Sequence, residues 1–343
     1  MRRFSWAALA VLLACGGDDS RPPDGAVTLG GLTTLGGTDA SASDSADGTD
    51  GADGIGGSDD GGAGSSASAS GGTPGFDVGS ANPDGDQNDG CQKVDVVFAV
   101  DNSGSMSEEH DALRGPVFDS FPQQLLDINN GIEDFRLGVI DACPKPAWFH
   151  SWGASGACNF STGTNYMSST SPSLAAEFSC VTAFSDQGFE NMPDQCVDDG
   201  AFADDDEQPS LKAAEAVSAV NLAGMNPDFL RDDAILFIVA MTDEDEELAD
   251  VGSAQEIYNR IVAAKGGDVT NVVYLGVAGG SACLGPYGTA LDAVNARGVA
   301  NLFSAAGQGL FWDLCDGNLE TAFQTAISTL VDDTCQGFTP PEG

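Results

Sequence analysis

The chain divides sharply at residue 90, and this division sets what can fold. The stretch 16–90 consists mainly of Gly, Ser, Ala, Thr and Asp, and Phe76 is its only aromatic residue. Such a segment cannot bury enough apolar surface to offset the conformational entropy lost on folding. It holds 14 Asp and one basic residue, Arg21, so its formal charge is −13. We therefore expect 16–90 to be a disordered, extended and acidic linker.

The first fifteen residues are typical of an export signal. Arg2 and Arg3 precede an apolar run, 4–14, which is shorter than the roughly 20 residues that a membrane-spanning helix needs. The run ends in the sequence Leu-Leu-Ala-Cys at 12–15, which resembles the lipobox of bacterial lipoproteins. The resemblance implies that Cys15 is acylated and becomes the new N-terminus. The alternative is a secreted protein that has a cysteine at its cleavage site.

Acylation of Cys15 would define the location of the protein. Two or three acyl chains meet the requirement for more than one anchoring signal. The lipobox resemblance implies a bacterial cell envelope, with contact to the membrane through the anchor only. Gly16 in the next position favours transfer to the outer membrane over retention in the inner one. The protein would then face the periplasm or the cell surface.

The cysteine content indicates an oxidising compartment. The chain has nine cysteines, more than is typical of a cytosolic protein. Because it has no CxxC pair and two histidines, we do not expect a structural zinc site. Without Cys15, eight cysteines remain, and eight allow many connectivities. Pairing each cysteine with a sequence neighbour, and joining the two ends of the folding part, gives four hypothetical disulfides: Cys143–Cys158, Cys180–Cys196, Cys283–Cys315 and Cys91–Cys335.

The part from 91 to 338 has the pattern of one large α/β domain, followed by a short tail, 339–343. Short apolar runs, expected for strands buried on both faces, alternate with helical patterns of ten to fifteen residues. This alternation predicts a doubly wound, mainly parallel central sheet with helices on both faces, a Rossmann-like arrangement that disulfides would stabilise. The expected strands are 94–100, 135–140, 234–241 and 269–277, and the expected helices are 211–222, 254–264, 291–303 and 319–331.

The charge balance excludes one class of partner. The chain has 53 acidic and 12 basic residues and a formal charge of −41. A protein that binds the phosphate backbone of nucleic acids needs clustered Lys and Arg, which this chain lacks. We therefore expect no nucleic-acid partner.

Two acidic loops follow predicted strands. Residues 101–107 come directly after the strand 94–100, and residues 242–247 come after the strand 234–241. Ligands of open α/β sheets bind beyond the carboxyl ends of the strands. Asp101, Ser103 and Ser105 supply a carboxylate and two hydroxyls within one turn, and such hard oxygen donors suit Mg²⁺, Mn²⁺ or Ca²⁺. The competing interpretation is that these side chains cap helix N-termini.

These residues resemble the metal-ion-dependent adhesion site of the von Willebrand factor type A family. Asp101, Ser103 and Ser105 match its DxSxS signature, and Asp243 matches the distal aspartate that follows a hydrophobic central strand. The resemblance extends from Cys91 to about Cys335. It implies one bound divalent cation, Mg²⁺ or Ca²⁺, and an adhesion-type role towards an extracellular or envelope protein or glycan.

The chain departs from the family at its third element, a threonine before a middle helix. That position falls near Asp205, within an acidic run at 204–207. Asp205 is either a cation ligand or part of an acidic first helical turn. As a third carboxylate it would give the site a net charge of −1 and favour Ca²⁺. Together with surrounding carboxylates, which we expect at 108–111 and 244–247, it would favour neutral ligand groups over acidic ones.

The stretch 141–200 is longer than the family's usual connection and forms an insertion with four cysteines. It carries an aromatic cluster that includes Trp148 and Trp152. These indoles either stack on a ligand such as a sugar ring or cover the core under a long loop.

Three functions follow from the sequence. The favoured one is a lipid-anchored, metal-dependent binding module on a flexible stalk. The second is a scaffold whose cation is purely structural. A hydrolase is the least favoured, because no GxSxG, HExxH or phosphate-binding loop is present and His110 is expected on the exposed face of the first helix.

Overall fold

A computed structural model describes residues 91, 93–127, 132, 134–143, 147–153, 155–183, 207–248 and 251–339. The predicted export signal, linker and tail, at 1–15, 16–90 and 339–343, lie outside these residues except for position 339. Among the helices that the structure describes, none combines the length and the apolar character needed to cross a membrane.

The domain is α/β, with a six-stranded sheet in the order β10-β7-β6-β1-β2-β5. All neighbouring pairs are parallel except β2 with β5, which is antiparallel. The expected strands form, and β5 and β10 join them at the two edges. The strands are β1 (Lys93–Val100), β2 (Asp134–Asp141), β5 (Met167–Ser168), β6 (Ile235–Met241), β7 (Val272–Ala278) and β10 (Gly309–Asp313).

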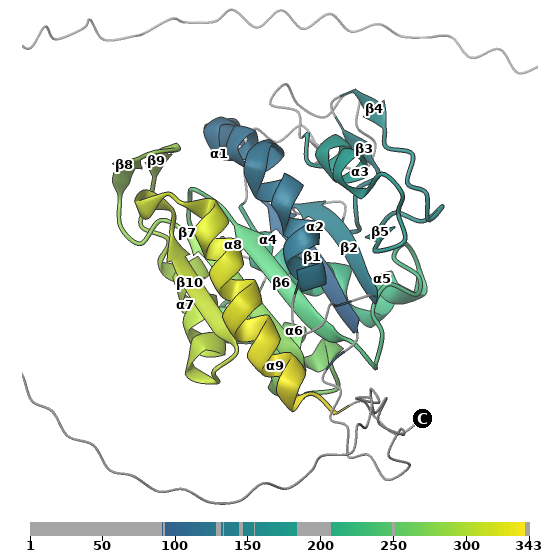
Figure 1. Ribbon diagram of the computed structural model, residues 1–343. Helices are drawn as coiled ribbons and strands as arrows, with labels where there is room; N and C mark the ends of the chain where they lie inside the picture. The colour runs from purple at the N-terminus through teal and green to yellow at the C-terminus, as the bar shows by residue number, and fades with distance from the viewer. Residues whose placement is uncertain are drawn as a thin grey trace, which may run out of the picture. The chain divides into compact units, whose positions relative to one another are not determined.

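Helices cover both faces of the sheet, as the sequence predicts (Figure 1). One face packs against α1, α2, α8 and α9, and the other against α4, α6 and α7. The helices are α1 (Ser107–Ala112), α2 (Phe118–Asp127), α3 (Leu174–Val181), α4 (Pro209–Ala216), α5 (Ala219–Ala223), α6 (Ala254–Ala264), α7 (Val294–Ala305), α8 (Leu319–Thr325) and α9 (Asp332–Gly337). Two short hairpins lie outside the sheet: β3 (Trp152–Gly153) with β4 (Gly156–Ala157), and β8 (Cys283–Gly285) with β9 (Gly288–Ala290).

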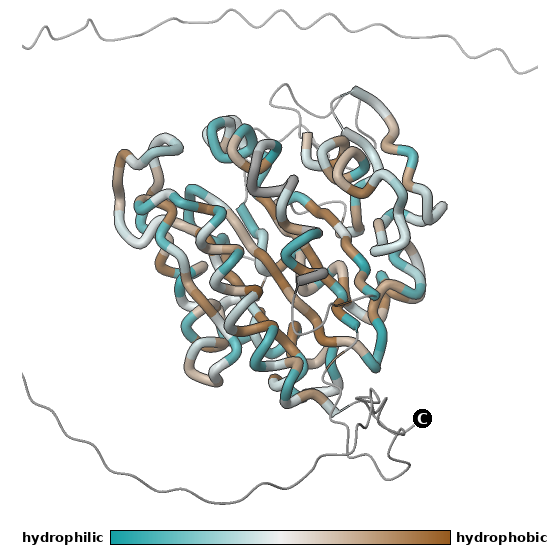
Figure 2. Tube along the Cα trace, in the orientation of Figure 1, coloured by the Kyte–Doolittle hydropathy of each residue, from teal (hydrophilic) through white to brown (hydrophobic). Residues whose placement is uncertain are grey.

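The core consists of two apolar layers, one on each side of the sheet. In β1, Val94, Val96 and Phe98 face one layer, whereas Val97 and Ala99 face the other. Because successive strand residues point to opposite faces, a strand buried on both sides must be apolar throughout. Figure 2 shows these continuous apolar strands crossing the centre of the domain.

Several element boundaries differ from the sequence prediction, and two of them have a clear local cause. The helix expected at 211–222 is broken into α4 and α5, because the Ser218 side chain accepts a hydrogen bond from the Asn221 N–H and starts a new helix. The strand expected at 269–277 begins at Val272. Asp268 accepts a hydrogen bond from the Thr270 N–H, which forms a turn in place of the first strand residues.

The structure confirms two of the hypothetical disulfides and corrects the other two. Cys91–Cys335 and Cys283–Cys315 are present, with Cα atoms 4.5 and 6.0 Å apart. Cys158 pairs with Cys180, so the pairings Cys143–Cys158 and Cys180–Cys196 are wrong. The reason is spatial: the β3–β4 hairpin lies against the end of α3, where the Cys180 carbonyl sits so close to Gly153 that a Cβ there would be 1.9 Å from its oxygen. Cys143 is also disulfide-bonded, and Cys196 lies outside the described residues.

Candidate metal centre

The sheet brings the two acidic loops together at the carboxyl ends of two central strands. β1 and β6 are parallel neighbours, and their last residues, Val100 and Met241, are paired. The Asp101 N–H then donates to the Met241 carbonyl at 2.9 Å. The order of strands reverses around β1, with β2 on one side and β6, β7 and β10 on the other. Parallel sheets bind ligands at such a reversal, beyond the carboxyl ends of the strands.

Four of the five predicted ligands converge there. The Ser103 and Ser105 hydroxyls are 2.9 Å apart, and the Ser105 hydroxyl donates to Asp243 Oδ1 at 3.1 Å. Asp101 Oδ1 accepts from the Ser103 N–H at 2.7 Å, which fixes the turn of the DxSxS segment. The fifth predicted ligand, Asp205, lies outside the described residues.

Thr242 is a further member of this group that the sequence argument did not include. Its hydroxyl donates to Asp101 Oδ2 at 2.8 Å, and it also accepts from the Glu244 N–H at 3.0 Å. Thr242 therefore holds one oxygen of Asp101 while Ser103 holds the other. Its position directly before Asp243, at the end of a buried strand, is the sequence signal for this role.

The two aspartates are buried and the serines are not. Asp101 and Asp243 are each 2% exposed, whereas Ser103 is half-buried and Ser105 exposed. Burial raises the pKa of Asp101 to about 6. Burial, together with the nearby Asp101 carboxylate, raises the pKa of Asp243 to about 7. Both shifts arise mainly because burial removes the hydration that stabilises a charged carboxylate.

Glu109 is a third buried carboxyl group near Asp101 and Asp243. It is 1% exposed, and its Oε2 has no hydrogen-bond partner among the described residues. Burial raises its pKa to about 8, and the charges of Asp243, Glu108 and Asp101 contribute. Glu108 is exposed because consecutive residues of a helix point in directions about 100° apart. The sequence shows the Glu-Glu pair after the DxSxS segment but not which of the two points inward.

His110 lies on the buried side of α1, contrary to the expectation of an exposed position. It is 6% exposed, and its Nε2 is 2.7 Å from the Asp101 carbonyl oxygen. The side chain therefore contacts the backbone at the start of the DxSxS segment. Its place is therefore structural, adjacent to the site.

In the acidic run at 244–247, the charge of Glu244 acts on Asp101 and Asp243, but Asp245 and Glu246 bind elsewhere. Asp245 Oδ1 accepts from the Asn295 N–H at 2.7 Å, in the first turn of α7. Glu246 is fully buried and accepts from the N–H groups of Ser210 and Leu211, at the start of α4. Helix N-termini favour acidic acceptors. The expectation that these two carboxylates surround the cation is therefore wrong.

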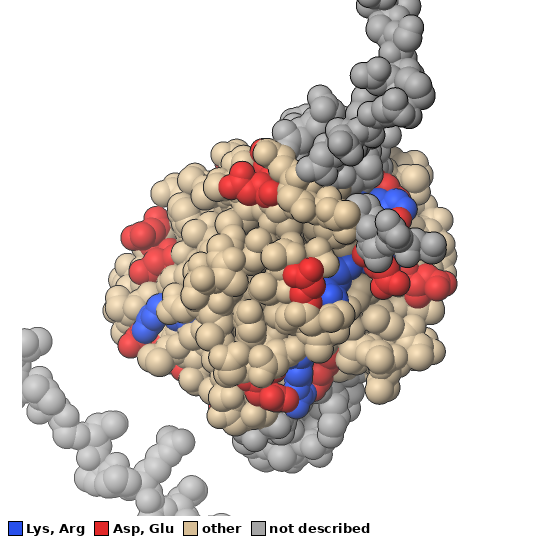
Figure 3. Space-filling model, turned by 90° about the horizontal axis from the view of Figure 1, so that it is seen from below, with Lys and Arg blue, Asp and Glu red and all other residues tan. Residues whose placement is uncertain are grey.

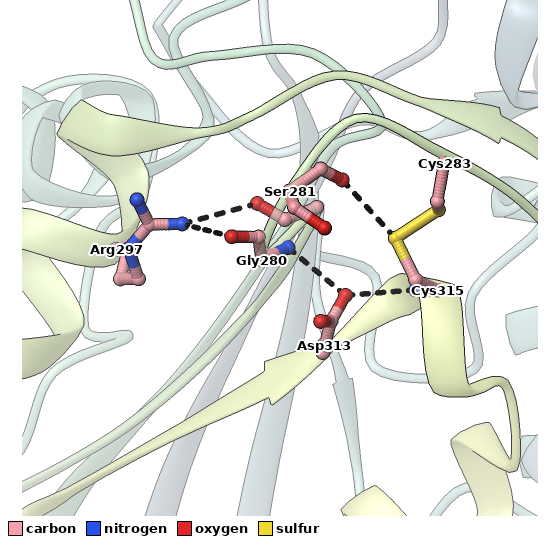
Figure 4. The surroundings of a disulfide bond; sticks show 7 residues. Gly280, Ser281, Cys283, Arg297, Asp313 and Cys315 are labelled. Carbon is pink, nitrogen blue, oxygen red and sulfur yellow. Dashed lines mark hydrogen bonds between the residues drawn. A yellow bond between two sulfur atoms is a disulfide. The ribbon is translucent and has the colours of Figure 1, made fainter.

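The β8–β9 hairpin forms one rim of the site. The Leu291 N–H, just after β9, donates to the Asp243 carbonyl at 2.7 Å. At the base of the hairpin, the Cys283–Cys315 disulfide is held by Asp313, whose Oδ1 accepts from the N–H groups of Gly280 and Cys315, both at 2.9 Å (Figure 4). The hairpin is thus fixed beside the acidic edge.

The donor chemistry fits a hard divalent cation. Among the described residues, no group of three or more His, Cys, Asp or Glu is arranged to hold a metal ion. A cation at this edge would therefore depend on hydroxyl oxygens, from Ser103 and Ser105, in addition to Asp101 and Asp243. Carboxylate and hydroxyl oxygens are donors that Mg²⁺ and Ca²⁺ accept, and the two raised pKa values describe carboxylates that a cation would stabilise in their charged form.

Comparison with known proteins adds no identification. No protein-family model matches this chain, and no curated protein matches it at a significant level.

The metal-free protein should become more stable as the pH falls from 8.0 to 6.5. The folded-state pKa values of Asp101, Asp243, Glu109 and Glu246, at about 6, 7, 8 and 7, lie above the usual values near 4. The folded state therefore binds more protons in this window, and stability is lost as the pH rises through these values. In a chelator, we expect Tm to be roughly 5–10 °C higher at pH 6.5 than at pH 8.0.

The window ends at pH 6.5 because burial lowers the pKa of His150 to about 3, so this group destabilises the fold at lower pH. The Glu109→Gln variant, which cannot titrate at that position, is the matched control and should show a flatter Tm profile. A Tm that rises between pH 6.5 and 8.0 in chelator would contradict the raised pKa values of these four carboxyl groups.

Proposed function

We propose that this chain is a lipid-anchored, divalent-metal-dependent binding module of the von Willebrand factor A type, carried on the acidic segment 16–90. One observation carries the proposal. Four residues, Asp101, Ser103, Ser105 and Asp243, meet beyond the carboxyl ends of two central parallel strands, where the strand order reverses. The Ser105–Asp243 hydrogen bond joins residues that are 138 positions apart in the sequence. The family resemblance of the same four residues agrees with this position.

The exposure of the hydroxyl side favours ligand binding over a purely structural cation. The carboxylates of Asp101 and Asp243 are almost fully buried, so they approach a cation from the protein side. Ser105 is exposed, which leaves the opposite side open to a group from another molecule. A purely structural cation would be enclosed by protein donors.

The rim of the site supports a macromolecular partner. Leu291, whose backbone contacts Asp243, is 51% exposed, and Leu284 on β8 and Val294 at the start of α7 are 81% and 55% exposed. Exposed apolar side chains beside a polar site are typical of interaction surfaces. We propose an extracellular or envelope protein or glycan that offers a neutral oxygen to the cation and an apolar group to this rim.

The charged surface supports the exclusion of nucleic acid. Basic side chains on the face shown in Figure 3 lie beside acidic ones and form no basic patch there. Among the described residues, the partly exposed Lys93 is likewise paired with an acidic side chain, that of Asp233. Phosphate backbones require unpaired, clustered cations.

Calorimetric titration of the chelator-treated chain with Mg²⁺, and separately with Ca²⁺, tests the metal centre. We expect one ion per chain at pH 7.5. The Asp101→Ala variant should bind the ion at least about 100-fold more weakly, because it loses one of the two carboxylates that would neutralise the charge.

Asp111→Ala is the matched control, since Asp111 is exposed on α1 and pairs with Arg114. It should bind the ion as the unmodified chain does. Equal affinity in the Asp101→Ala variant, or no binding of either ion to the unmodified chain, would refute the proposal. A saturating ion should also raise Tm by several degrees, and this rise should be absent in Asp101→Ala.

A further inference from the structure

An open pocket of about 480 Å³ lies on the β5 side of the sheet, and none of its lining residues belongs to the metal centre. Two of the four tryptophans of the chain, Trp148 and Trp152, line it together with Phe149 and Met225. Both indoles are partly exposed, and Met225 is 51% exposed. Phe149 is fully buried and supports the pocket from the core, where its ring lies edge-to-face against Phe229 with centroids 4.3 Å apart.

The rest of the lining is uncharged and includes Gly163, Pro227 and three polar side chains. Ser151, Thr164 and Asn165 contribute hydroxyl and amide groups. Among the described residues that line the pocket, none is Asp, Glu, Lys or Arg, although 53 acidic side chains are distributed along this chain. A charged ligand would lose its hydration here without gaining a partner of opposite charge. The lining therefore fits a neutral ligand that has both hydrogen-bonding groups and apolar faces.

The pocket is held in shape before any ligand arrives. Asn165 donates to the Phe149 carbonyl and to Asn226 Oδ1, at 3.2 and 2.8 Å, and Asn226 Oδ1 also accepts from the Phe149 N–H. Asn226 is itself fully buried and donates to the Ala216 carbonyl. These hydrogen bonds hold the Asn165 side chain and the Phe149 backbone in place, whereas Asn165 Oδ1 has no hydrogen-bond partner among the described residues.

The backbone of Trp152 is fixed as well. Trp152 pairs with Ala157 in the β3–β4 hairpin, and the Cys158 N–H donates to the Ser151 carbonyl at 2.7 Å. The Cys158–Cys180 disulfide ties this hairpin to α3. A preformed pocket lowers the entropy lost on binding.

We propose that this pocket binds a neutral saccharide, with Trp148 and Trp152 as the contact surface for a sugar ring. The C–H face of a pyranose is apolar and packs on an aromatic side chain, while its hydroxyls can donate to the side-chain oxygens of Ser151, Thr164 and Asn165. The volume lies within the range of about 300–1,000 Å³ that is usual for small-molecule sites, so a short saccharide fits. The site is independent of the proposed cation.

The test is a titration of the full chain, in chelator, with maltotriose, cellotriose and triacetylchitotriose, followed by calorimetry and tryptophan fluorescence. We expect saturable binding of at least one of them. Trp152→Ala should weaken that binding about tenfold or more, and Trp152→Phe should retain part of it. Trp312→Phe, on β10 at the opposite edge of the sheet, is the matched control and should bind as the unmodified chain does.

Asp101→Ala separates this proposal from the metal centre, because it should bind the saccharide unchanged. Circular dichroism of each variant verifies that it is folded. The proposal is overturned if none of the three saccharides binds at 10 mM or below (about 3 kcal/mol). It is also overturned if Trp152→Ala and Trp148→Ala, both folded, bind as tightly as the unmodified chain, or if only an apolar peptide occupies the pocket.

Discussion

Replacing both Cys91 and Cys335 with serine should lower the free energy of unfolding by roughly 5–6 kcal/mol. This disulfide joins residues 244 positions apart, so it constrains the unfolded chain more than any other disulfide among the described residues. In the folded state it holds the start of β1 beside α9, where the Cys91 N–H donates to the Cys335 carbonyl at 2.9 Å. Thermal unfolding of the variant, in non-reducing buffer, should show a Tm lower by roughly 10–20 °C.

The Cys283→Ser/Cys315→Ser variant is the control for loop length. Its disulfide spans 32 positions, and the same relation gives a loss of roughly 3–4 kcal/mol. The order of the two variants is the informative result. A smaller loss for Cys91→Ser/Cys335→Ser than for the control would mean that the ends of the domain do not depend on their disulfide.

Replacing Arg231 with alanine should destabilise the domain by roughly 3–5 kcal/mol. Arg231 pairs with Asp95 at 2.7 Å and with Asp134 at 2.6 Å, and its backbone N–H also donates to Asp95. Asp95 is fully buried in the middle of β1. Burial raises the pKa of Asp95, and Arg231 counteracts this rise. Without the guanidinium, a buried carboxylate is left without its charge partner. Chemical denaturation measures the loss.

Two further variants define the cause. Arg260→Ala removes an exposed ion pair with Glu256 on α6 and should cost less than about 1 kcal/mol. The double variant Asp95→Asn/Arg231→Met should regain much of the loss, because it removes the buried charge as well as its partner. If Arg231→Ala cost no more than Arg260→Ala, the importance assigned to the buried pair would be wrong.

The strands next to the site could be predicted because their sequences have one physical solution. β1, β2 and β6 are short apolar runs, and only a strand covered on both faces buries every residue of such a run. The helix α6 was also predicted with its observed bounds, since Ser253 caps it and its apolar residues recur at helical spacing. β10 escaped prediction, because its five residues are all only partly buried and lack a clear period.

The disulfides in the insertion show the limit of sequence proximity. Neighbouring cysteines close short loops at low entropic cost, which favoured Cys143–Cys158. The observed Cys158–Cys180 pair depends instead on the β3–β4 hairpin and on the end of α3. Hairpins of two-residue strands carry almost no periodicity, so their contacts become visible only in three dimensions.

The candidate metal centre was predictable as a set of residues but not as an arrangement. Spacing identified Asp101, Ser103 and Ser105, and the family resemblance, with its aspartate after a hydrophobic central strand, implied Asp243. The neighbours could not be sorted by sequence, because residue type does not fix direction. Glu109 is buried close enough to Asp101 and Asp243 for their charges to raise its pKa, whereas Asp245 and Glu246 bind helix N-termini. Whether Asp205 takes part is a prediction that lies outside the described residues.

The Cys91–Cys335 disulfide also fixes both ends of the domain on one side of the sheet. The chain enters the sheet at Lys93, beside Cys335, and Asp101 follows at the other end of the same strand, eight residues later. A strand of that length spans about 26 Å. The two ends of the domain, at Cys91 and Cys335, therefore lie on the side opposite the acidic loops. A label attached directly next to either end of the domain would therefore lie far from the acidic loops.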